Sequence, residues 1–432
     1  MNAVIIAGGE GERIRSVARA SPKPLLEVGG CPLVEHQILL LHRYGIHEIH
    51  LTVRARDLET FRERLGTGER WGIALHYHAE RKPLGTAGGI APILDGRGKP
   101  FIVLYGDVMV HMDLEALVAF HRAKKAAATL VVHPTDHPLD SDLVEVDGHG
   151  RIKAFHRKPH RRTPSCRNLG SAAAYVLSSS IAAHLPAGAS DFVRDVFPSA
   201  LAAGLPLFGY RTREYLKDIG TPERLARVRA DWEAGRIERR HRDHALPAVF
   251  FDRDGTLLDS VPLLHDAGEI RLFPGAAEAL RRVNQADFLA VVITNQPVVA
   301  RGLCTLDELE RIHARFETLL AEQGAILDAI YFCPHHPDVG YPGERAELKI
   351  ACACRKPGGE LLRRAARDLN IDLSRSVFVG DSTRDIETGR RLGLRTVLVQ
   401  TGEAGRDGKF PAQPNASCAD VAEAVELILG QW

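Results

Sequence analysis

The chain has 432 residues, of which 45% are apolar and 26% charged, and its formal net charge is +1. This length exceeds one ordinary core and predicts two domains, while the near-neutral charge argues against bulk attraction to nucleic acid or to an acidic membrane. The apolar run that follows Met1 is too short for a signal peptide or a membrane span, so we expect a cytoplasmic protein. Seven cysteines, an odd and sparse set, argue against a disulfide framework.

Short apolar runs alternate with segments of helical spacing, such as Glu360–Leu369, along the whole chain. This alternation predicts an α/β fold with two doubly wound, mainly parallel sheets, whose sites form at the carboxyl ends of the strands. The predicted strands are Ala3–Ala7, Glu48–Val53, Phe101–Tyr105, Thr129–His133, Ala248–Asp252, Leu289–Thr294, Ala329–Cys333, Val377–Gly380 and Thr396–Val399.

The segment from Pro222 to Pro247 separates the two predicted sheets. It is charged, helical at first, and ends in an Arg/His-rich stretch, which indicates a closing helix and a linker with a solvated face rather than a nucleic-acid patch. We therefore predict domains over residues 1–225 and 247–432, joined by a helix end and linker over 226–246.

A glycine loop follows the first predicted strand. Gly8 and Gly11 allow close approach of backbone N–H groups to phosphate, and Arg13 and Lys23 supply positive charge shortly after them. The pattern predicts a nucleotide site, and a plain tight turn between strand and helix is the alternative.

The pattern GGxGxR…PKPLLxVGG resembles the sugar-1-phosphate nucleotidyltransferases, and the resemblance continues over about residues 1–225 through KPLGTAGGI, YGDVMV, FHRKP, NLGSAAAYVLS and LKDIGTPERL. It implies a Rossmann-like domain in which a sugar 1-phosphate attacks the α-phosphorus of a nucleoside triphosphate and pyrophosphate leaves. It also implies roles for individual residues: Mg²⁺ binding by Asp107 and Asp218, triphosphate contact by Gly8, Gly11, Arg13 and Lys23, base or sugar contact by Gly85, Thr86 and Gly88, sugar-phosphate binding by Lys158, and sugar contact by Asn168 and Gly170.

Two positions depart from that family. Glu12 stands where the family usually has threonine, and Arg157 where it has an acidic residue. A carboxylate beside a triphosphate is unfavourable unless it points away or meets the metal, so a catalytically silent nucleotide-binding module stays open as an alternative. The closest resemblance is to heptose 1-phosphate guanylyltransferases, which favours GTP.

Two carboxylates open the C-terminal half. Asp252 and Asp254 follow a predicted strand, and one can attack phosphorus while the other moves protons, although an Asp-rich turn is the alternative. Thr294, Lys356 and Asp381 come at or after later strands. A hydroxyl, a lysine and carboxylates that hold a divalent cation are what phosphoryl transfer needs.

The ordered set DxDGT, T, K and GDxxxD resembles the haloacid-dehalogenase superfamily of phosphatases. The resemblance implies that Asp252 is the nucleophile, that Asp254 is the general acid and base, and that Thr294 and Lys356 bind the transferring phosphate. It further implies that Mg²⁺ is held by Asp252, Asp381 and the backbone carbonyl of Asp254, with Asp385 in support.

A second metal pattern lies between these motifs. Cys333 and His335 precede Cys352 and Cys354, and thiolates and an imidazole at this spacing can close a tetrahedral Zn²⁺ shell. Four protein ligands leave no open position, so we expect a structural zinc. His336 is the alternative imidazole, and three buried cysteines acting as small apolar residues are the alternative to a metal.

The zinc loop before CRKPGG resembles the D-glycero-D-manno-heptose 1,7-bisphosphate 7-phosphatases and the related histidinol-phosphate phosphatases, and TNQPVVARG favours the heptose family despite its departure at Pro297 and Val298. The resemblance implies substrate contacts from Asn295, Arg301 and Arg355. Together the halves predict a bifunctional enzyme of NDP-heptose synthesis that binds sugar phosphates and a nucleoside triphosphate, with a homo-oligomer left open. A histidinol-phosphate phosphatase fused to another transferase is the alternative, and a zinc-dependent nucleic-acid-binding protein is disfavoured by the charge.

Overall fold

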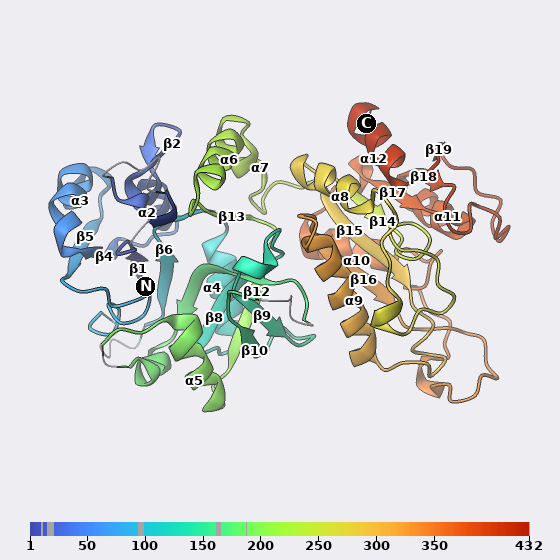
Figure 1. Cartoon of the computed structure of the whole chain (residues 1–432), viewed down its shortest axis with the longest axis horizontal. Coiled ribbons are helices and arrows are strands. Elements are labelled where there is room, and N and C mark those ends of the chain that lie inside the picture. The colour runs from blue at the N-terminus through green and yellow to red at the C-terminus, as the bar shows by residue number, and fades with distance from the viewer. Residues whose placement is uncertain (10–11, 15–20, 94–98, 161–165, 187, 432) are drawn as a thin grey trace. The chain divides into compact units, whose positions relative to one another are not determined.

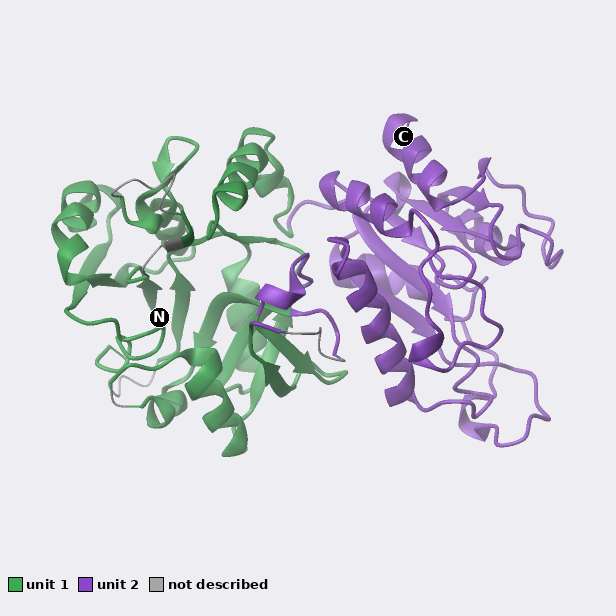
Figure 2. Cartoon of the chain, viewed as in Figure 1, with its two compact units in different colours: residues 1–133, 142–158, 170–242 green, residues 134–141, 159–169, 243–432 purple. Residues whose placement is uncertain are grey.

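A computed structural model of the chain describes all residues except 10–11, 15–20, 94–98, 161–165, 187 and 432 (Figure 1). The chain divides into two compact units (Figure 2). Unit 1 consists of Met1–His133, Asp142–Lys158 and Gly170–Arg242, and unit 2 consists of Pro134–Ser141, Pro159–Leu169 and Asp243–Trp432. The last change of unit falls inside the predicted linker, and the predicted domain limits themselves stay a prediction.

Unit 1 is built on a nine-stranded mixed sheet with the path β10-β9-β11-β6-β1-β4-β5, while β8 pairs with β11 and β12. The run β6-β1-β4-β5 is parallel, and β11 is antiparallel to β6. The strands are β1 (Asn2–Ile6), β4 (Glu48–Arg54), β5 (Ala74–Glu80), β6 (Phe101–Tyr105), β8 (Ala128–His133), β9 (Leu143–Val146), β10 (Ile152–His156), β11 (Gly170–Leu177) and β12 (Leu207–Arg211).

Two smaller sheets complete unit 1. One pairs β2 (Glu27–Val28) with β3 (Cys31–Pro32), and the other pairs β7 (Val108–His111) with β13 (Tyr215–Asp218). In the second sheet the strands are antiparallel and Asp218 lies opposite Val108. This register brings the chain around residue 107 next to the end of β13, although the two segments are far apart in sequence.

The helices of unit 1 bury their apolar sides against these sheets. Helix α4 begins at a capping aspartate, Asp113, which accepts a hydrogen bond from the backbone of Ala116, and α6 begins after Thr221 with a proline in its first turn. The helices are α2 (Leu33–Arg43), α3 (Leu58–Leu65), α4 (Leu114–Ala123), α5 (Phe197–Ala202), α6 (Pro222–Glu233) and α7 (Arg236–Arg239), with short turns η1 (Glu12–Ile14), η2 (Lys23–Leu25), η3 (Ala55–Asp57), η4 (Glu69–Trp71), η6 (Ser179–His184) and η7 (Phe192–Val196).

Unit 2 contains a six-stranded parallel sheet with the order β16-β15-β14-β17-β18-β19. The first strand in sequence, β14, lies in the middle, so its carboxyl end is flanked by the carboxyl ends of β15 and β17. The strands are β14 (Ala248–Phe251), β15 (Leu289–Asn295), β16 (Ala329–Cys333), β17 (Val377–Gly380), β18 (Arg395–Val399) and β19 (Ala416–Cys418).

Both faces of this sheet are buried. Val249 and Phe251 belong to one apolar cluster with α8 and α12, while Ala248 and Phe250 belong to a second with α10. Covered faces explain why the parallel strands are continuous apolar runs. The helices are α8 (Ala276–Gln285), α9 (Leu306–Ala321), α10 (Glu360–Leu369), α11 (Thr383–Arg391) and α12 (Val421–Gln431), with short turns η5 (Pro138–Asp140), η8 (Ala267–Glu269), η9 (Ala346–Leu348) and η10 (Leu373–Arg375).

The predicted α/β class is confirmed, and every predicted strand is present with its ends within one residue of the prediction. The structure also contains strands that were not predicted: the short strands β2, β3, β7, β9, β10, β13 and β19, and β5, β11 and β12. Several of these are short or lie at sheet edges, where the apolar pattern is weak; β5, for example, reads ALHYHAE. Within the described part of the chain, every helix falls short of the length and apolar character that a membrane crossing requires.

Candidate functional site

Three carboxylates meet at the carboxyl edge of the sheet in unit 2. Asp252 follows β14 directly, Asp381 follows β17, and Asp385 lies in the first turn of α11, where its side chain also caps the helix together with Ser382. One carboxylate oxygen from each aspartate lies within 4.8 Å of the others. Because β14 and β17 are parallel neighbours, their ends place these residues in one group that can hold a metal ion.

Lys356 reaches into this group from the loop before α10. Its Nζ lies 2.8 Å from Asp252 Oδ1 and 2.7 Å from Asp385 Oδ1, and it donates to the carbonyl of Ile293 at 3.0 Å. The lysine is 3% exposed. Burial alone would lower the pKa of Lys356, but the two carboxylates raise it above its ordinary value, so the side chain is held as a cation.

One cation does not neutralise three carboxyl groups. Burial raises the pKa of Asp252 to about 6, against the opposing attraction of Lys356. Burial, followed by repulsion from Asp252 and Asp385, raises the pKa of Asp381 to about 8. Excess negative charge on oxygen ligands is what a divalent cation such as Mg²⁺ offsets, so the donor set fits the predicted ion.

Asp254 is held by two residues that the sequence analysis did not single out. The guanidinium of the fully buried Arg253 donates to both carboxylate oxygens, at 3.1 Å from Nε to Oδ1 and 2.9 Å from Nη2 to Oδ2. Gln296 Nε2 donates to Asp254 Oδ2 and to Thr294 Oγ1, both at 2.8 Å. Gln296 thereby links the predicted acid and base to the predicted phosphate-binding hydroxyl.

The loop after β18 packs against Asp381, a contact that was not predicted from the sequence. The backbone N–H of Glu403 donates to Asp381 Oδ2 at 2.7 Å, and that of Gly405 donates to the Asp381 carbonyl at 2.7 Å. A Cβ atom at Gly402 would clash with the Asp381 carboxylate, and φ there is +56°. The backbone can approach Asp381 this closely only because glycine stands at this position.

Two of the predicted substrate contacts of unit 2, Asn295 and Arg355, lie beside Lys356. Asn295 makes paired hydrogen bonds with the Lys356 backbone, accepting from its N–H at 3.0 Å and donating to its carbonyl at 3.2 Å. Arg355 donates to the carbonyl of His335 at 3.2 Å, and the guanidinium of Arg301 lies 4.3 Å from the ring centre of Tyr341. Burial, followed by repulsion from a neighbouring arginine, lowers the pKa of Arg355, as expected where positive charge gathers.

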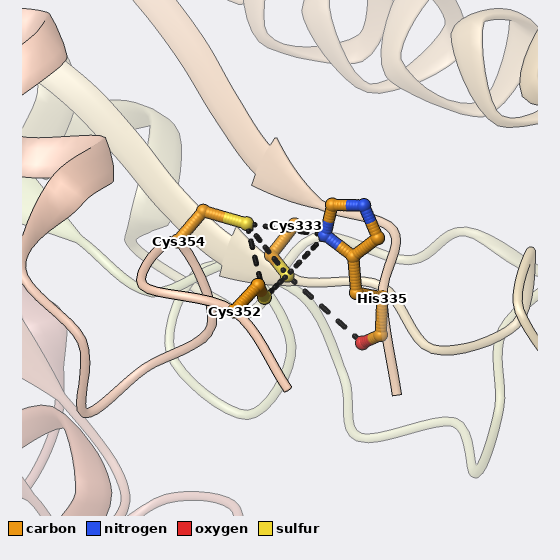
Figure 3. A group of neighbouring side chains, drawn as sticks. All are labelled: Cys333, His335, Cys352 and Cys354. Carbon is orange, nitrogen blue, oxygen red and sulfur yellow. Dashed lines mark hydrogen bonds between the residues drawn. The ribbon is translucent and has the colours of Figure 1, made fainter. Parts of the chain in front are cut away.

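The four predicted zinc ligands come together beside this loop (Figure 3). Cys354 Sγ lies 3.2 Å from the sulfurs of Cys333 and Cys352 and 3.2 Å from His335 Nδ1, distances far too long for disulfides. They are close to the separation of about 3.5 Å that ligands bound at about 2.0–2.3 Å have around a tetrahedral ion. His336 is not among the residues whose ligand atoms lie within 4.8 Å of one another, and its Nδ1 accepts from the backbone N–H of Asp338.

In unit 1 the two predicted metal ligands lie on the sheet formed by β7 and β13. The carbonyl of Asp107 accepts from the Ile219 N–H at 2.9 Å, and its carboxylate lies 3.5 Å from Lys23 Nζ. Asp218 is paired with Arg224 Nη1 at 2.8 Å. The two carboxylates are 34% and 32% exposed, and each already has a cation beside it.

The glycine-rich segments of unit 1 have tight contacts of their own. Gly8 accepts from Arg54 Nε at 2.8 Å, while Gly11 lies outside the described residues. A Cβ atom at Gly85 or Gly88 would clash with the backbone of Ser190 or Gly188. Thr86 Oγ1 donates to Asp191 at 2.6 Å, and Arg13 is exposed, close to Gly220.

The predicted sugar contacts are spread over both units. Lys158 is exposed, and its backbone N–H donates to Asp142 at 3.1 Å; Gly170 begins β11. Asn168 is 3% exposed and belongs to unit 2, where its backbone N–H donates to Glu317 at 2.9 Å and its side chain to the Thr135 carbonyl at 2.7 Å. Its side chain is thus engaged within the protein, and the sugar contact stays a prediction.

Different families of known proteins match the N-terminal and the C-terminal part of the chain. The sequence model of the family described as nucleotidyl transferase matches residues 2–235, and the one described as HAD-hydrolase-like matches residues 353–424. The D-glycero-D-manno-heptose-1,7-bisphosphate 7-phosphatase of Thermosynechococcus vestitus is 41% identical over 189 residues, which cover 42% of this chain and 95% of that protein.

A further relative matches the N-terminal part. The mannose-1-phosphate guanylyltransferase of Mycobacterium tuberculosis is 33% identical over 238 residues, which cover 54% of this chain and 65% of that protein. Among solved structures, the D,D-heptose 1,7-bisphosphate phosphatase from B. bronchiseptica, complexed with magnesium and phosphate, is 34% identical, with a TM-score of 0.38 over 43% of this chain and 98% of that one.

Proposed function

The chain belongs to the nucleotidyl transferase family through residues 2–235 and to the D-glycero-D-manno-heptose-1,7-bisphosphate 7-phosphatase family through its C-terminal part, and we propose that it makes an NDP-heptose in two consecutive steps. Unit 2 removes the 7-phosphate of the bisphosphate. Unit 1 then transfers a nucleotidyl group to the remaining 1-phosphate. The product of the first reaction is the substrate of the second, which gives a reason for the two activities to share one chain.

The observation that carries the phosphatase step is the ion pair of Lys356 with Asp252 and Asp385 at the strand edge. Asp252 attacks phosphorus and forms an aspartyl phosphate while the bond from phosphorus to the sugar oxygen breaks, and Asp254 gives that oxygen a proton. Asp254 then takes a proton from water, whose oxygen attacks the aspartyl phosphate. This releases inorganic phosphate and restores Asp252.

The other residues of unit 2 hold the substrate. Lys356 and Thr294 bind the oxygens of the transferring phosphate, and Asn295, Arg301 and Arg355 contact the rest of the sugar phosphate. Arg253 and Gln296 hold the carboxylate of Asp254 in place. Their contacts leave Asp254 with a defined position from which to serve the leaving oxygen and then the water.

Two metals complete unit 2 in this proposal. Mg²⁺ would be held by Asp252, Asp381 and the backbone carbonyl of Asp254, with Asp385 nearby, and would offset charge on the phosphoryl oxygens. Zn²⁺ would be held by Cys333, His335, Cys352 and Cys354 and would fix the loop that presents Arg355 and Lys356.

For unit 1 we propose in-line transfer without a covalent enzyme intermediate. The sugar 1-phosphate oxygen attacks the α-phosphorus of the triphosphate, and pyrophosphate leaves. Asp107 and Asp218 would hold Mg²⁺, and Arg13 and Lys23 would face the triphosphate with Gly8 and Gly11. We favour GTP, which agrees with the guanylyltransferase activity named for the M. tuberculosis relative.

The remaining predicted contacts of the transfer reaction follow from the same proposal. Gly85, Thr86 and Gly88 lie near base or sugar. Lys158 would bind the sugar phosphate, and Asn168 and Gly170 would face the sugar.

The test is incubation of the full chain with Mg²⁺, heptose 1,7-bisphosphate and each of the four nucleoside triphosphates in turn, followed by mass spectrometry. We expect inorganic phosphate in every reaction and a GDP-heptose with GTP. Faster phosphate release from histidinol phosphate than from the heptose bisphosphate would favour the alternative phosphatase. Binding of triphosphate without any release of pyrophosphate would favour a silent N-terminal module.

A further inference from the structure

Three histidines that neither proposed reaction uses lie together on the sheet of unit 1. His50 is in β4, and His76 and His78 are in β5. The parallel register places His50 opposite His76 and Thr52 opposite His78. Because side chains alternate along a strand, all three imidazoles project from the same face of the sheet.

The ring of His50 contacts both of the other rings. His50 Nδ1 lies 2.9 Å from His78 Nε2. The rings of His50 and His76 are stacked, with centroids 4.9 Å apart and an angle of 26° between their planes. His50 is therefore the central member of the group, with one ring on either side.

The burial pattern leaves this group open to solvent from one side. The alternate residues Ile49, Leu51 and Leu75 face the apolar core, so the histidines are on the opposite face. His76 is exposed, and His50 and His78 are half-buried. Since β5 ends the strand order of the sheet, an ion can reach these rings, and the exposed His76 ring can rotate about its side-chain bonds.

A hydrogen bond between His50 and His78 accounts for only one contact of the group. It does not explain the third imidazole, which is stacked on the central ring. Each neutral imidazole carries one ring lone pair that can bind a metal.

The spacing of one pair agrees with shared coordination. Two nitrogens bound to one ion at about 2.0–2.1 Å are about 3 Å apart, and His50 Nδ1 and His78 Nε2 have this separation in their hydrogen bond. Metal binding would move the proton of that bond to another ring nitrogen and turn the exposed His76 ring toward the pair, because the three rings are not among the described groups whose ligand atoms all lie within 4.8 Å of one another. We propose that His50, His76 and His78 form a second transition-metal site, separate from the cysteine-containing group of unit 2, that takes a divalent ion of the nickel, copper and zinc class. Imidazole ligands without thiolate suit these ions, and the open sheet edge leaves room for water as further ligands.

The test uses the untagged full chain whose cysteine group has first been saturated with Zn²⁺ and freed of excess metal. Titration with Ni²⁺ in a calorimeter, in the presence of excess Mg²⁺ that occupies the proposed carboxylate sites, should show one saturable site per chain. His76→Gln should weaken Ni²⁺ binding by at least about tenfold, and combined replacement of all three histidines by Gln should abolish it. His76 is exposed, so this single variant stays interpretable even if the triple variant fails to fold.

His149→Gln and His265→Gln, at exposed histidines elsewhere, are the matched controls and should bind Ni²⁺ like the unaltered chain. Cu²⁺ bound to the unaltered chain should show nitrogen hyperfine coupling in its paramagnetic resonance spectrum, and the triple variant should lose it. No saturable Ni²⁺ binding by the unaltered chain, or equal binding by His76→Gln, would overturn the proposal.

Discussion

The charged groups of the two units are arranged differently. In unit 2, Asp252, Asp381, Asp385 and Lys356 are gathered in one largely buried group at the ends of neighbouring strands. In unit 1, the side chains of Asp107 and Asp218 are 34% and 32% exposed, and each is paired with a different cation, Lys23 or Arg224. The charged side chains of the first group are therefore fixed by contacts with one another, whereas those of the second are separate and partly exposed to solvent.

This difference matches the chemistry proposed for each unit. A nucleophile that becomes covalently attached to its substrate must be positioned in advance, and a buried ion pair with lysine does this. In-line transfer joins two bound substrates, so the protein holds them and neutralises charge that they bring with them. The comparison implies that single substitutions should affect unit 2 more severely than unit 1.

The largest effect should come from Asp252→Asn, which removes the proposed nucleophile. Phosphate release from heptose 1,7-bisphosphate should fall by about 10⁴-fold or more, because no other described carboxylate follows β14 in the same position. A phosphate-release assay measures this. Nucleotidyl transfer to heptose 1-phosphate by the same variant is the internal control and should be unchanged. Phosphate release within tenfold of the unaltered chain would remove Asp252 from the role of nucleophile.

Asp218→Asn should give the next largest effect, on unit 1 alone. Loss of one carboxylate beside the proposed metal should lower pyrophosphate release by about 10²–10³-fold, with phosphatase activity retained. A coupled pyrophosphate assay is the measurement. Asp147→Asn, in a turn of the same unit, is the matched control and should retain full transfer. Equal activity of the two variants would mean that Asp218 takes no part in the transfer.

Cys354→Ser tests the proposed zinc group independently of the active site beside it. The variant should lose bound zinc, and the free energy of unfolding of unit 2 should fall by roughly 3 kcal/mol or more, since structural zinc contributes about 10–16 kcal/mol in zinc-finger peptides. Elemental analysis and denaturant unfolding measure the two changes. Cys418→Ser, at a buried cysteine outside the group, should keep its zinc. Unchanged zinc content in Cys354→Ser would refute the proposed ligand set.

The smallest effect concerns pH. The pKa of Asp381 is raised from 3.8 to about 8, so between these values the folded chain binds more protons than the unfolded chain. Without Mg²⁺, the free energy of unfolding should therefore fall as pH rises through this window, from this group's contribution. Mg²⁺ binds the deprotonated carboxylate, so the rise in Tm that it produces should grow from about pH 6 to about pH 8 and then level off. An Mg²⁺ effect on Tm that is constant with pH would contradict this expectation, and Asp381→Asn should abolish the growth.

Much of the molecule could be predicted because its signals are local. The apolar runs that became β14, β15 and β17 are continuous, since both faces of a parallel sheet are buried. Asp252 and Asp381 follow such runs directly, so both could be placed at the carboxyl edge of a parallel sheet, and the family resemblance implied that they share a metal. The cysteine and histidine spacing likewise pointed to four residues that lie together in the structure.

Contacts between distant segments could not be predicted in the same way. The hydrogen bond of Gln296 to Asp254, and the approach of the Gly402 loop to Asp381, join segments that no periodic pattern connects. The same holds for the histidine group, since His50 and His76 are opposite each other only because β4 and β5 pair in one particular register.

The sequence by itself determined the α/β class, the long apolar strands and the carboxylates at their ends, because burial and backbone geometry act over a few consecutive residues. Only the tertiary structure decided which side chains meet across the strand edges. That outcome depends on strand pairing, register and the packing of loops, which are properties of the whole fold.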